Sequence, residues 1–283
     1  MFSIILNLFF ENSENMINSS INMKNIKVYG KPPFNVAVIH SGPGAPGEIA
    51  PMARELSTGW GVLEPLQTAA SLEGQVQELY DVLKKNGALP ITLIGWSWGA
   101  MLSFIFTARC TSMVKKLILV GSGAFEKKYT EEIMKTRLNR LSEAERLEIR
   151  TLMGTLNDSA IADKNIPMSR FAELIFKADS YDTLPYKSEI LEFQYHIFQS
   201  VWKDAEEFRA SGGLLNLGRQ IQCPVVAIHG DYDPHPYQGV RKPLSRVIKD
   251  FRFILLEKCG HYPWFEHEAR GSFYDIIKKE LKQ

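Results

Sequence analysis

The residue best placed for nucleophilic chemistry is Ser97, at the centre of the sequence GWSWG (residues 95–99). This pentapeptide directly follows the apolar run PITLIGW (residues 90–96) and precedes an apolar stretch with helical spacing, residues 99–108. In a strand–turn–helix setting, glycines permit the close backbone approach of a sharp turn that lifts a serine hydroxyl above a sheet. The start of the helix also directs its positive end at developing negative charge. This context predicts that Ser97 is a nucleophile.

A serine hydroxyl needs a general base, and that base needs an orienting carboxylate. Candidates for both follow strand-like runs, CPVVAIH (residues 223–229) and FRFILLE (residues 251–257), where parallel sheets place their ligand sites. The second run leads into CGHYP, so His261 is the predicted base. The first leads into GDYDP, which offers two carboxylates, Asp231 and Asp233.

The other histidines suit other roles. His40 ends a strand-like run, where ordering of the backbone is the better interpretation, and His229 lies within another. His196 falls in a helical pattern and His267 lies near the start of the last one. His235 follows the GDYDP loop and is expected to be an exposed loop histidine rather than part of a cleft.

Acyl transfer also needs two preorganised N–H donors for the oxyanion of the tetrahedral intermediate. One comes from the residue after the nucleophile, here Trp98, and the other from a loop after an earlier strand. The loop HSGPG (residues 40–44) follows the run FNVAVIH (residues 34–40) and lies upstream of Ser97. Gly42 is therefore the second predicted donor.

Strand-like and helical patterns alternate in the first and last parts of the chain, as in a parallel α/β sheet. Predicted strands cover residues 34–40, 61–66, 90–96, 114–121, 223–229 and 251–256, and predicted helices cover residues 71–85, 99–108, 237–247 and 266–281. Between them, residues 122–219 show helical patterns only. These include a capping box of Ser142 with Glu145 and a helix with Pro167 in its first turn.

The domain organisation follows from this layout. An α/β core is predicted over residues 23–121 and 220–283, with an all-helical cap over residues 122–219. Residues 1–22 are expected to be an appendage. Their apolar start, MFSIILNLFF, has no basic residue before it and no small-residue cleavage site after it, and it is too short to span a membrane.

Composition narrows the choice of partners. The formal net charge is +1, so neither nucleic acid nor a strongly acidic substrate is expected, and a small neutral or amphipathic molecule is. The three cysteines show no CxxC spacing and are interpreted as free thiols, which favours a reducing, cytoplasmic location. Cys259 is assigned a packing role. No cluster has metal-ligand spacing, so neither a metal nor another cofactor is expected.

Four motifs, HSGPG, GWSWGA, GDYDP and CGHYPWFE, together resemble the α/β-hydrolase superfamily and, within it, the proline iminopeptidase-like branch. That branch shows HGGPG after a strand, G-x-SWG at the elbow, G-x-x-D before a helix and GH near the end. The resemblance covers roughly residues 23–283, although the cap matches only in position and helical character. It implies an α/β-hydrolase fold with a triad of Ser97, Asp233 and His261. Asp233 is favoured over Asp231 because it lies three residues after Gly230.

The same resemblance implies Trp98 and Gly42 as the oxyanion donors. Ser41 departs from the pattern by replacing the first glycine, which either narrows the loop or adds a hydroxyl. The cap does not show the tryptophan–glutamate pattern associated with a substrate's free amine. Because Ser97 stands where related epoxide hydrolases and haloalkane dehalogenases carry an aspartate, those reactions are disfavoured.

The resulting prediction is a serine hydrolase that cleaves small esters or amides through an acyl-enzyme on Ser97. The alternatives are a proline iminopeptidase-like aminopeptidase, an acyltransferase with the same triad, and a ligand sensor with weak turnover. An aminopeptidase would need a cap carboxylate for the substrate's ammonium group. The cap's candidate glutamates are expected to be solvated helix-face charges instead: Glu173, Glu189, Glu192, Glu206 and Glu207.

Overall fold

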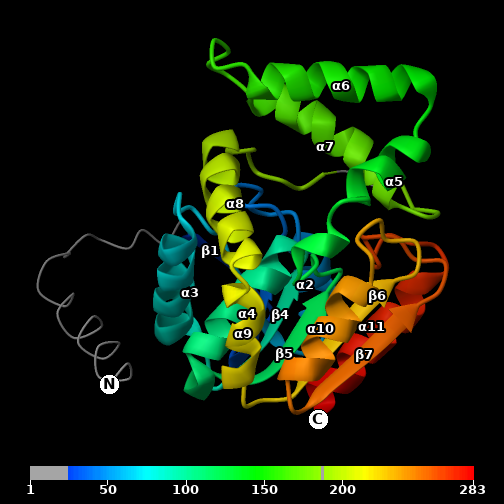
Figure 1. Ribbon diagram of the computed structural model, residues 1–283. Coiled ribbons are helices and arrows are strands. Elements are labelled where there is room, and N and C mark those ends of the chain that lie inside the picture. Colours follow the sequence, from blue (N-terminus) through cyan, green and yellow to red (C-terminus); the bar gives the residue numbers. More distant parts are fainter. Residues whose placement is uncertain (1–24, 186–187) are drawn as a thin grey trace, which may run out of the picture.

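A seven-stranded sheet forms the centre of the protein, in the strand order β1-β3-β2-β4-β5-β6-β7 (Figure 1). The computed structural model describes residues 25–185 and 188–283. β1 runs antiparallel to β3, and all other neighbouring strands in this order are parallel. The strands are β1 (Ile26–Tyr29), β2 (Phe34–Ile39), β3 (Gly61–Pro65), β4 (Ile91–Trp96), β5 (Val114–Val120), β6 (Val225–Gly230) and β7 (Phe251–Leu256).

Helices cover both faces of the sheet, which explains why the central strands read as nearly continuous apolar runs. One face packs against α3 (Leu72–Asn86), α4 (Trp98–Arg109) and α10 (Gln238–Val247). The other packs against α2 (Ala50–Leu56) and α11 (Ala269–Lys282). Both the α/β-hydrolase fold class and the mostly parallel sheet are therefore confirmed.

Between β5 and β6 the described residues form helices, and their one β-type pairing is an isolated bridge from Thr183 to Glu266. The predicted capping box is present: the Ser142 hydroxyl accepts the Glu145 amide, and the Glu145 carboxylate accepts the Ser142 amide. The helices are α5 (Ile133–Asn139), α6 (Glu143–Asn157), α7 (Asn165–Asp179), α8 (Tyr195–Ala210) and α9 (Gly213–Leu217), with short 3₁₀ turns η3 (Lys127–Tyr129) and η4 (Gly218–Gln220). A further 3₁₀ turn, η2 (Thr111–Met113), lies between α4 and β5.

This helical region packs in two different ways. Residues of α6 and α7, with the turn before α6, form a small apolar cluster of their own: Leu141, Ile149, Leu174 and Ala178. α8, by contrast, buries Ile197, Val201 and Ala205 in the main cluster that covers the sheet. In Figure 1, α6 and α7 accordingly form an upper layer, whereas α8 runs down beside α3 and α4.

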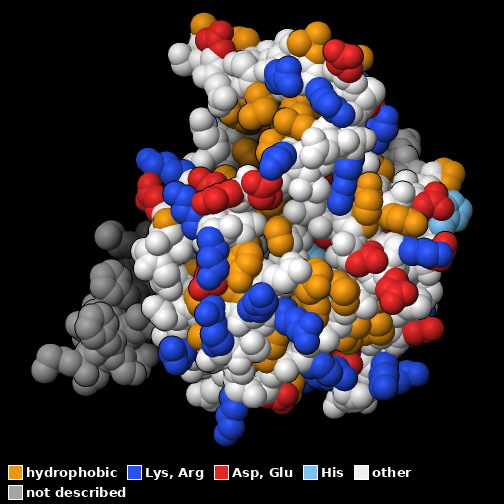
Figure 2. Space-filling model, turned by 45° about the vertical axis from the view of Figure 1, so that its right-hand side comes forward, with side chains coloured by type: hydrophobic (Ala, Val, Ile, Leu, Met, Phe, Trp, Pro, Cys, Tyr) orange, Lys and Arg blue, Asp and Glu red, His pale blue; other side chains and the backbone are white. Residues whose placement is uncertain are grey.

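The division at residues 122 and 219 stays a prediction, and residues 1–22 lie outside the described residues. Within the described ranges, none of the helices combines the length and apolar character that crossing a membrane requires. Figure 2 shows Lys and Arg side chains interspersed with Asp and Glu over one face, and apolar side chains gathered at the height of α6 and α7.

The sequence predicts neither β1 nor α2. β1 is a four-residue edge strand with no fully buried position, so it lacks a strong apolar pattern. α2 begins within a Gly/Pro-rich segment and carries Pro51 in its first turn, where proline is tolerated. The predicted strands, in contrast, agree with the structure to within two residues at each end.

Gly99 allows α4 to start directly against the end of β2. A Cβ at this position would lie 2.3 Å from the carbonyl oxygens of both Ile39 and His40, so the backbone would have to move. Gly154 provides a contrast, because it is an exposed residue of α6 whose added Cβ would meet no atom within 4 Å.

We expect Gly99→Ala to lower the free energy of unfolding by about 2 kcal/mol or more, because overpacking against backbone cannot be relieved by a side-chain rotation. Gly154→Ala should raise it by about 0.5–1 kcal/mol, because alanine reduces the entropy of the unfolded chain and favours the helix. Urea unfolding followed by circular dichroism measures both. Equal effects of the two substitutions would contradict this account of the elbow.

Candidate active site

Ser97 lies in a strained turn between β4 and α4. Its φ of 56° and ψ of −116° are unusual for a residue with a side chain, and its amide donates to the Val120 carbonyl at 2.9 Å. Gly95, two residues earlier, is as tightly packed as Gly99: an added Cβ would lie 2.2 Å from the Gly99 carbonyl oxygen. The GWSWG sequence therefore forms the sharp strand–turn–helix that its glycines predict.

Asp233 and His261 are brought together, although 28 residues separate them. Asp233 follows β6, and His261 lies in the loop after β7, at the same edge of the sheet as Ser97. The imidazole Nδ1 lies 2.7 Å from Asp233 Oδ2, and both side chains are buried. Trp96 Nε1 donates to the His261 carbonyl at 2.9 Å, which ties the histidine loop to the end of β4.

Asp231, the alternative carboxylate, has a different partner. It is exposed, and its Oδ1 accepts the amide of Cys259 at 3.1 Å, so it orders the loop before His261 without a hydrogen bond to the imidazole. Cys259 itself is fully buried in an apolar cluster, as its packing role predicts.

The charges of Asp233 and His261 stabilise one another in this buried setting. Burial disfavours the imidazolium, but the charge of Asp233 and the hydrogen bond to it raise the pKa of His261 above its usual value. Burial likewise disfavours the carboxylate, but His261, His235 and His229 hold the pKa of Asp233 well below its usual range. Asp233 therefore carries a negative charge near neutral pH.

His235 corrects one sequence prediction, because it is not an exposed loop histidine. Its side chain is only 14% exposed, and its Nδ1 and its amide both donate to Asp233 Oδ1, at 2.7 and 2.9 Å. The turn after Asp233 folds back on β6, so the His235 carbonyl lies 2.9 Å from Nε2 of His229. Burial lowers the pKa of His235 to about 4, which keeps this imidazole neutral.

The loop from His40 to Gly44 is tied down by its own side chains. His40 Nδ1 donates to the Ser41 carbonyl at 2.6 Å and Nε2 accepts the Gln67 amide at 3.3 Å, so the ring is neutral and orders the backbone. Burial lowers its pKa to about 4. Gly42 has a φ of 30°, and its carbonyl accepts the Ala45 amide at 3.0 Å.

The two predicted oxyanion donors, the amides of Trp98 and Gly42, donate to no other group among the described residues. Free N–H groups of this kind are what an oxyanion requires. The glycine-rich loop is also held from outside: Gln194 and Leu191 donate their amides to Gly44 and Pro46, each at 2.9 Å. The segment before α8 thus positions the loop, a contact that no sequence pattern indicates.

Glu48 is a half-buried acid that the sequence motifs do not single out. The hydroxyl of Ser41 donates to its carboxylate, so replacing the usual glycine adds a side-chain link within the loop. Burial raises the pKa of Glu48 to about 7, although the Ser41 hydrogen bond and the nearby His261 act in the opposite direction. The one sequence signal for this link is that Ser41 replaces the usual glycine and that an acid, Glu48, follows seven residues later.

Two buried carboxylates fix the histidine loop to the helical region. Asp179, at the end of α7, receives two hydrogen bonds from Arg137 at 2.6 and 2.7 Å, and its carbonyl accepts the His261 amide at 2.8 Å. Glu266 accepts the amides of Gly260, Tyr181 and Asp182 at 2.8–2.9 Å. Neither role was predicted, because each joins segments that are far apart in the sequence.

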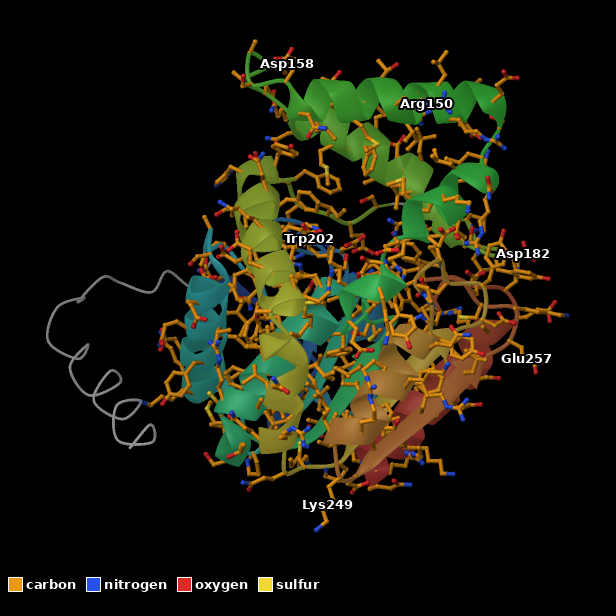
Figure 3. All side chains as sticks on the ribbon, viewed as in Figure 1. Arg150, Asp158, Asp182, Trp202, Lys249 and Glu257 are labelled. Carbon is orange, nitrogen blue, oxygen red and sulfur yellow. The ribbon has the colours of Figure 1, made fainter. Side chains whose placement is uncertain are left out.

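A cavity of about 220 Å³ opens beside Ser97, under the helical region. Residues before and within α5, residues of α8 and the start of α4 form its walls. In Figure 3, Trp202 marks the α8 side, between the sheet and the upper helices. The lining consists of Ser97, Trp98, Met101, Gly123, Ala124, Thr130, Ile133, Met134, Arg137, Trp202, Glu206, Arg209 and His235.

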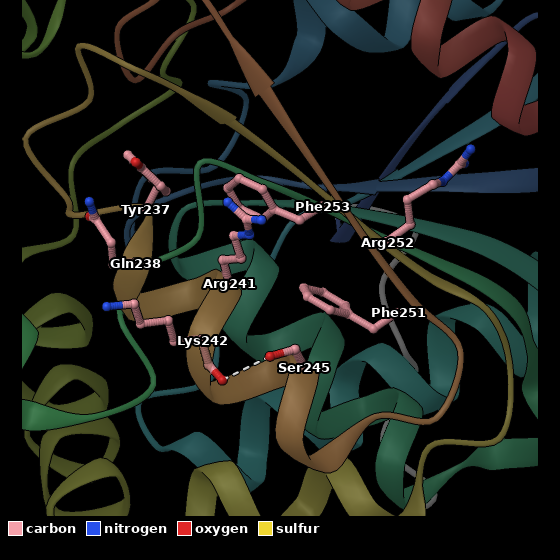
Figure 4. A pocket seen from close by; sticks show the side chains of 8 residues that line it. All are labelled: Tyr237, Gln238, Arg241, Lys242, Ser245, Phe251, Arg252 and Phe253. Atoms are coloured by element: carbon pink, nitrogen blue, oxygen red, sulfur yellow. Dashed lines mark hydrogen bonds between the residues drawn. The ribbon is translucent and has the colours of Figure 1, made fainter.

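A second hollow, of about 810 Å³, lies on the surface between α10 and β7 (Figure 4). Arg241 contacts the ring face of Phe253 there, with 5.9 Å from its guanidinium carbon to the ring centre. The residues that line this hollow do not include Ser97, Asp233 or His261, so a molecule bound there would lie away from these three side chains.

Asp233, His235 and His261 are also close enough for a metal ion, because their candidate ligand atoms lie within 4.8 Å of one another. Both imidazoles, however, direct Nδ1 at the carboxylate, at 2.7 Å. These hydrogen bonds account for the spacing without an ion.

Comparisons with solved structures find the same fold in several hydrolases. A proline iminopeptidase from Mycobacterium smegmatis is 18% identical, with a TM-score of 0.59 over 91% of this chain and 94% of that one. A meta-cleavage product hydrolase from Pseudomonas fluorescens is 16% identical, with a TM-score of 0.62 over 91% and 93%. A thermophilic esterase from Thermogutta terrifontis is 17% identical, with a TM-score of 0.60 over 91% and 92%.

Among curated proteins no match is found. Residues 63–268, well over half of the chain, match the family described as alpha/beta hydrolase fold. The strand order, the elbow at Ser97 and this match lead to one conclusion: the chain belongs to the α/β-hydrolase family.

Proposed function

We propose that this protein is a serine hydrolase that cleaves small esters or amides through an acyl-enzyme on Ser97. The observation that carries the proposal is the 2.7 Å contact between Asp233 and His261, at the sheet edge where the elbow presents Ser97. A buried carboxylate bonded to Nδ1 leaves Nε2 of the histidine as the available base. The hydrolytic family and the hydrolase structures of like fold support the reaction class.

In the proposed reaction, Ser97 Oγ attacks the substrate carbonyl carbon as its proton passes to His261 Nε2. The carbonyl oxygen becomes an oxyanion and accepts hydrogen bonds from the amides of Trp98 and Gly42. The leaving group departs with the proton from His261, and the acyl group stays on Ser97. His261 then deprotonates a water that attacks the acyl carbon, which releases the acid and restores the serine.

Asp233 has two roles in this scheme. It holds the tautomer with the proton on Nδ1, so that Nε2 can accept, and it stabilises the imidazolium that forms. Because Asp233 also accepts two hydrogen bonds from His235, its orientation is set before substrate arrives.

A second candidate, an aminopeptidase, is favoured by one observation: Glu206 lines the cavity beside Ser97. Other cap glutamates are engaged elsewhere, since Glu189 pairs with Arg54 and Glu173 with Arg170. Glu206 is exposed, however, and its carboxylate accepts Trp202 Nε1 at 3.2 Å. A solvated carboxylate is a weak site for an ammonium group, so the esterase or amidase remains the leading proposal.

Asp233→Asn should reduce kcat by about 10³- to 10⁴-fold because the wrong histidine tautomer is favoured. Asp231→Asn, which loses only a loop contact, is the matched control and should have a far smaller effect. A larger loss of kcat in Asp231→Asn than in Asp233→Asn would reverse the assignment.

In the wild type, kcat/KM should fall as the pH drops through the raised pKa of His261, because the base becomes protonated. In Asp233→Asn this fall should occur at lower pH, since the negative charge that raises the pKa of His261 is gone.

Esters without a free amine should be hydrolysed at least as well as aminoacyl arylamides. The measurement is kcat/KM for chromogenic substrates matched in side chain, with the amine free or acetylated, and Ser97→Ala as the control for the nucleophile. A strong preference for the free amine that Glu206→Gln abolishes would make the protein an aminopeptidase. Unreduced turnover by Ser97→Ala would refute the acyl-enzyme itself.

A further inference from the structure

Arg209 is a buried cation without a carboxylate partner, and it lines the same cavity as Ser97. Its exposed fraction is 7%, and among the described residues no acidic group lies within salt-bridge distance of it. Its Nε has no hydrogen-bond acceptor. Such a group is costly, because an unpaired charge loses its hydration without compensation.

The contacts that Arg209 does make are weak. One guanidinium nitrogen lies 3.9 Å from Met101 Sδ, and the guanidinium carbon lies 5.8 Å from the centre of the Trp202 ring. These contacts orient the side chain along the cavity wall but leave most of its five N–H donors unused. Burial accordingly lowers the pKa of Arg209.

Arg137, on the opposite wall of the same cavity, shows how this protein compensates a buried arginine elsewhere. It makes two hydrogen bonds to Asp179, at 2.6 and 2.7 Å, and the charge of that carboxylate raises its pKa despite burial. Arg209 has the donors for the same bidentate contact and lacks the carboxylate. The missing partner is thus a planar anion.

The other charged groups that face the cavity do not neutralise Arg209. His235 is neutral and bonded to Asp233. Glu206 is near enough to influence Arg209 electrostatically, but it is exposed, bonded to Trp202 and too far away for an ion pair. Arg209 therefore remains a positive charge without an ion-pair partner, in the wall of a cavity of about 220 Å³ that suits one small anionic group.

We propose that Arg209 binds a carboxylate carried by the substrate, while Ser97 attacks an ester or amide carbonyl of the same molecule. This inference rests on the proposed function and specifies its substrate class: small carboxylate-bearing esters or amides. A single guanidinium matches a single negative charge, which favours a carboxylate over a phosphate. The carboxylate can belong to the acyl group or to the leaving group, and the two arms of the test separate these sources.

The test uses two matched substrate pairs that differ only in a carboxylate or its neutral amide. For the acyl side, mono-4-nitrophenyl adipate is compared with 4-nitrophenyl adipamate, and for the leaving group, 4-acetoxybenzoate with 4-acetoxybenzamide. In the wild type we expect kcat/KM to favour the carboxylate by about 10- to 100-fold in at least one pair, as a charged hydrogen bond allows. Arg209→Gln should bring that ratio towards one, and Arg209→Lys should retain part of it.

Arg246→Gln is the matched control, because Arg246 lies on the surface of α10 in an ion pair with Glu126 and should not affect the ratio. The inference is overturned if the wild type shows no carboxylate preference in either pair, or if the preference survives in Arg209→Gln. If the wild type hydrolyses the neutral esters and Ser97→Ala does not, the proposed function stands in either case. If the wild type does not hydrolyse the neutral esters, or Ser97→Ala hydrolyses them equally well, the proposed function is refuted instead.

A second measurement applies even if Arg209→Gln does not fold. Adipate and benzoate should inhibit the wild type competitively against a neutral ester, and adipamide and benzamide should inhibit at least tenfold more weakly, roughly the worth of one charge-assisted contact. Equal inhibition by the acids and the amides would refute a carboxylate site at Arg209.

Discussion

The hydrogen bond between His261 and a buried, ionised Asp233 is the interaction on which the rest of this site depends. A carboxylate in a buried setting stays charged only if donors surround it, and His261 and His235 supply them. The loops after β6 and β7 must therefore meet at one edge of the sheet. The parallel order of β4, β5, β6 and β7 brings them there, beside the elbow that presents Ser97.

The helical region does more than cover this edge. Its segment before α8 holds the glycine-rich loop through backbone hydrogen bonds, and Asp179 at the end of α7 holds the histidine loop. α8 also packs in the main core, so the wall that carries Trp202 and Arg209 is a fixed part of the domain. The charge of Arg209 is therefore in place before substrate binds, and in our proposal it selects for substrates that carry a carboxylate.

The sequence predicted those features that a local pattern encodes. GWSWG after an apolar strand indicated the turn at Ser97, and the loop past the last strand indicated His261. The loop past the preceding strand offered both Asp231 and Asp233, and the family resemblance favoured Asp233. Contacts between distant segments leave no such pattern, so the Arg137–Asp179 pair and the burial of Arg209 without a carboxylate were not predicted. The Ser41–Glu48 link lies within one loop but belongs to none of the motifs. His235 was misread because its burial depends on a turn folding back on β6.

The most direct test of the central claim is to identify the residue that forms the covalent intermediate. The protein is treated with a 4-nitrophenyl alkylphosphonate, which mimics the tetrahedral intermediate and leaves a stable adduct on an activated serine. Mass spectrometry of the intact chain and of its peptides then locates the adduct. The account predicts one adduct per chain, on the peptide that contains Ser97, and none in Ser97→Ala. An adduct on Ser41 or another residue, with activity lost in proportion, would contradict it.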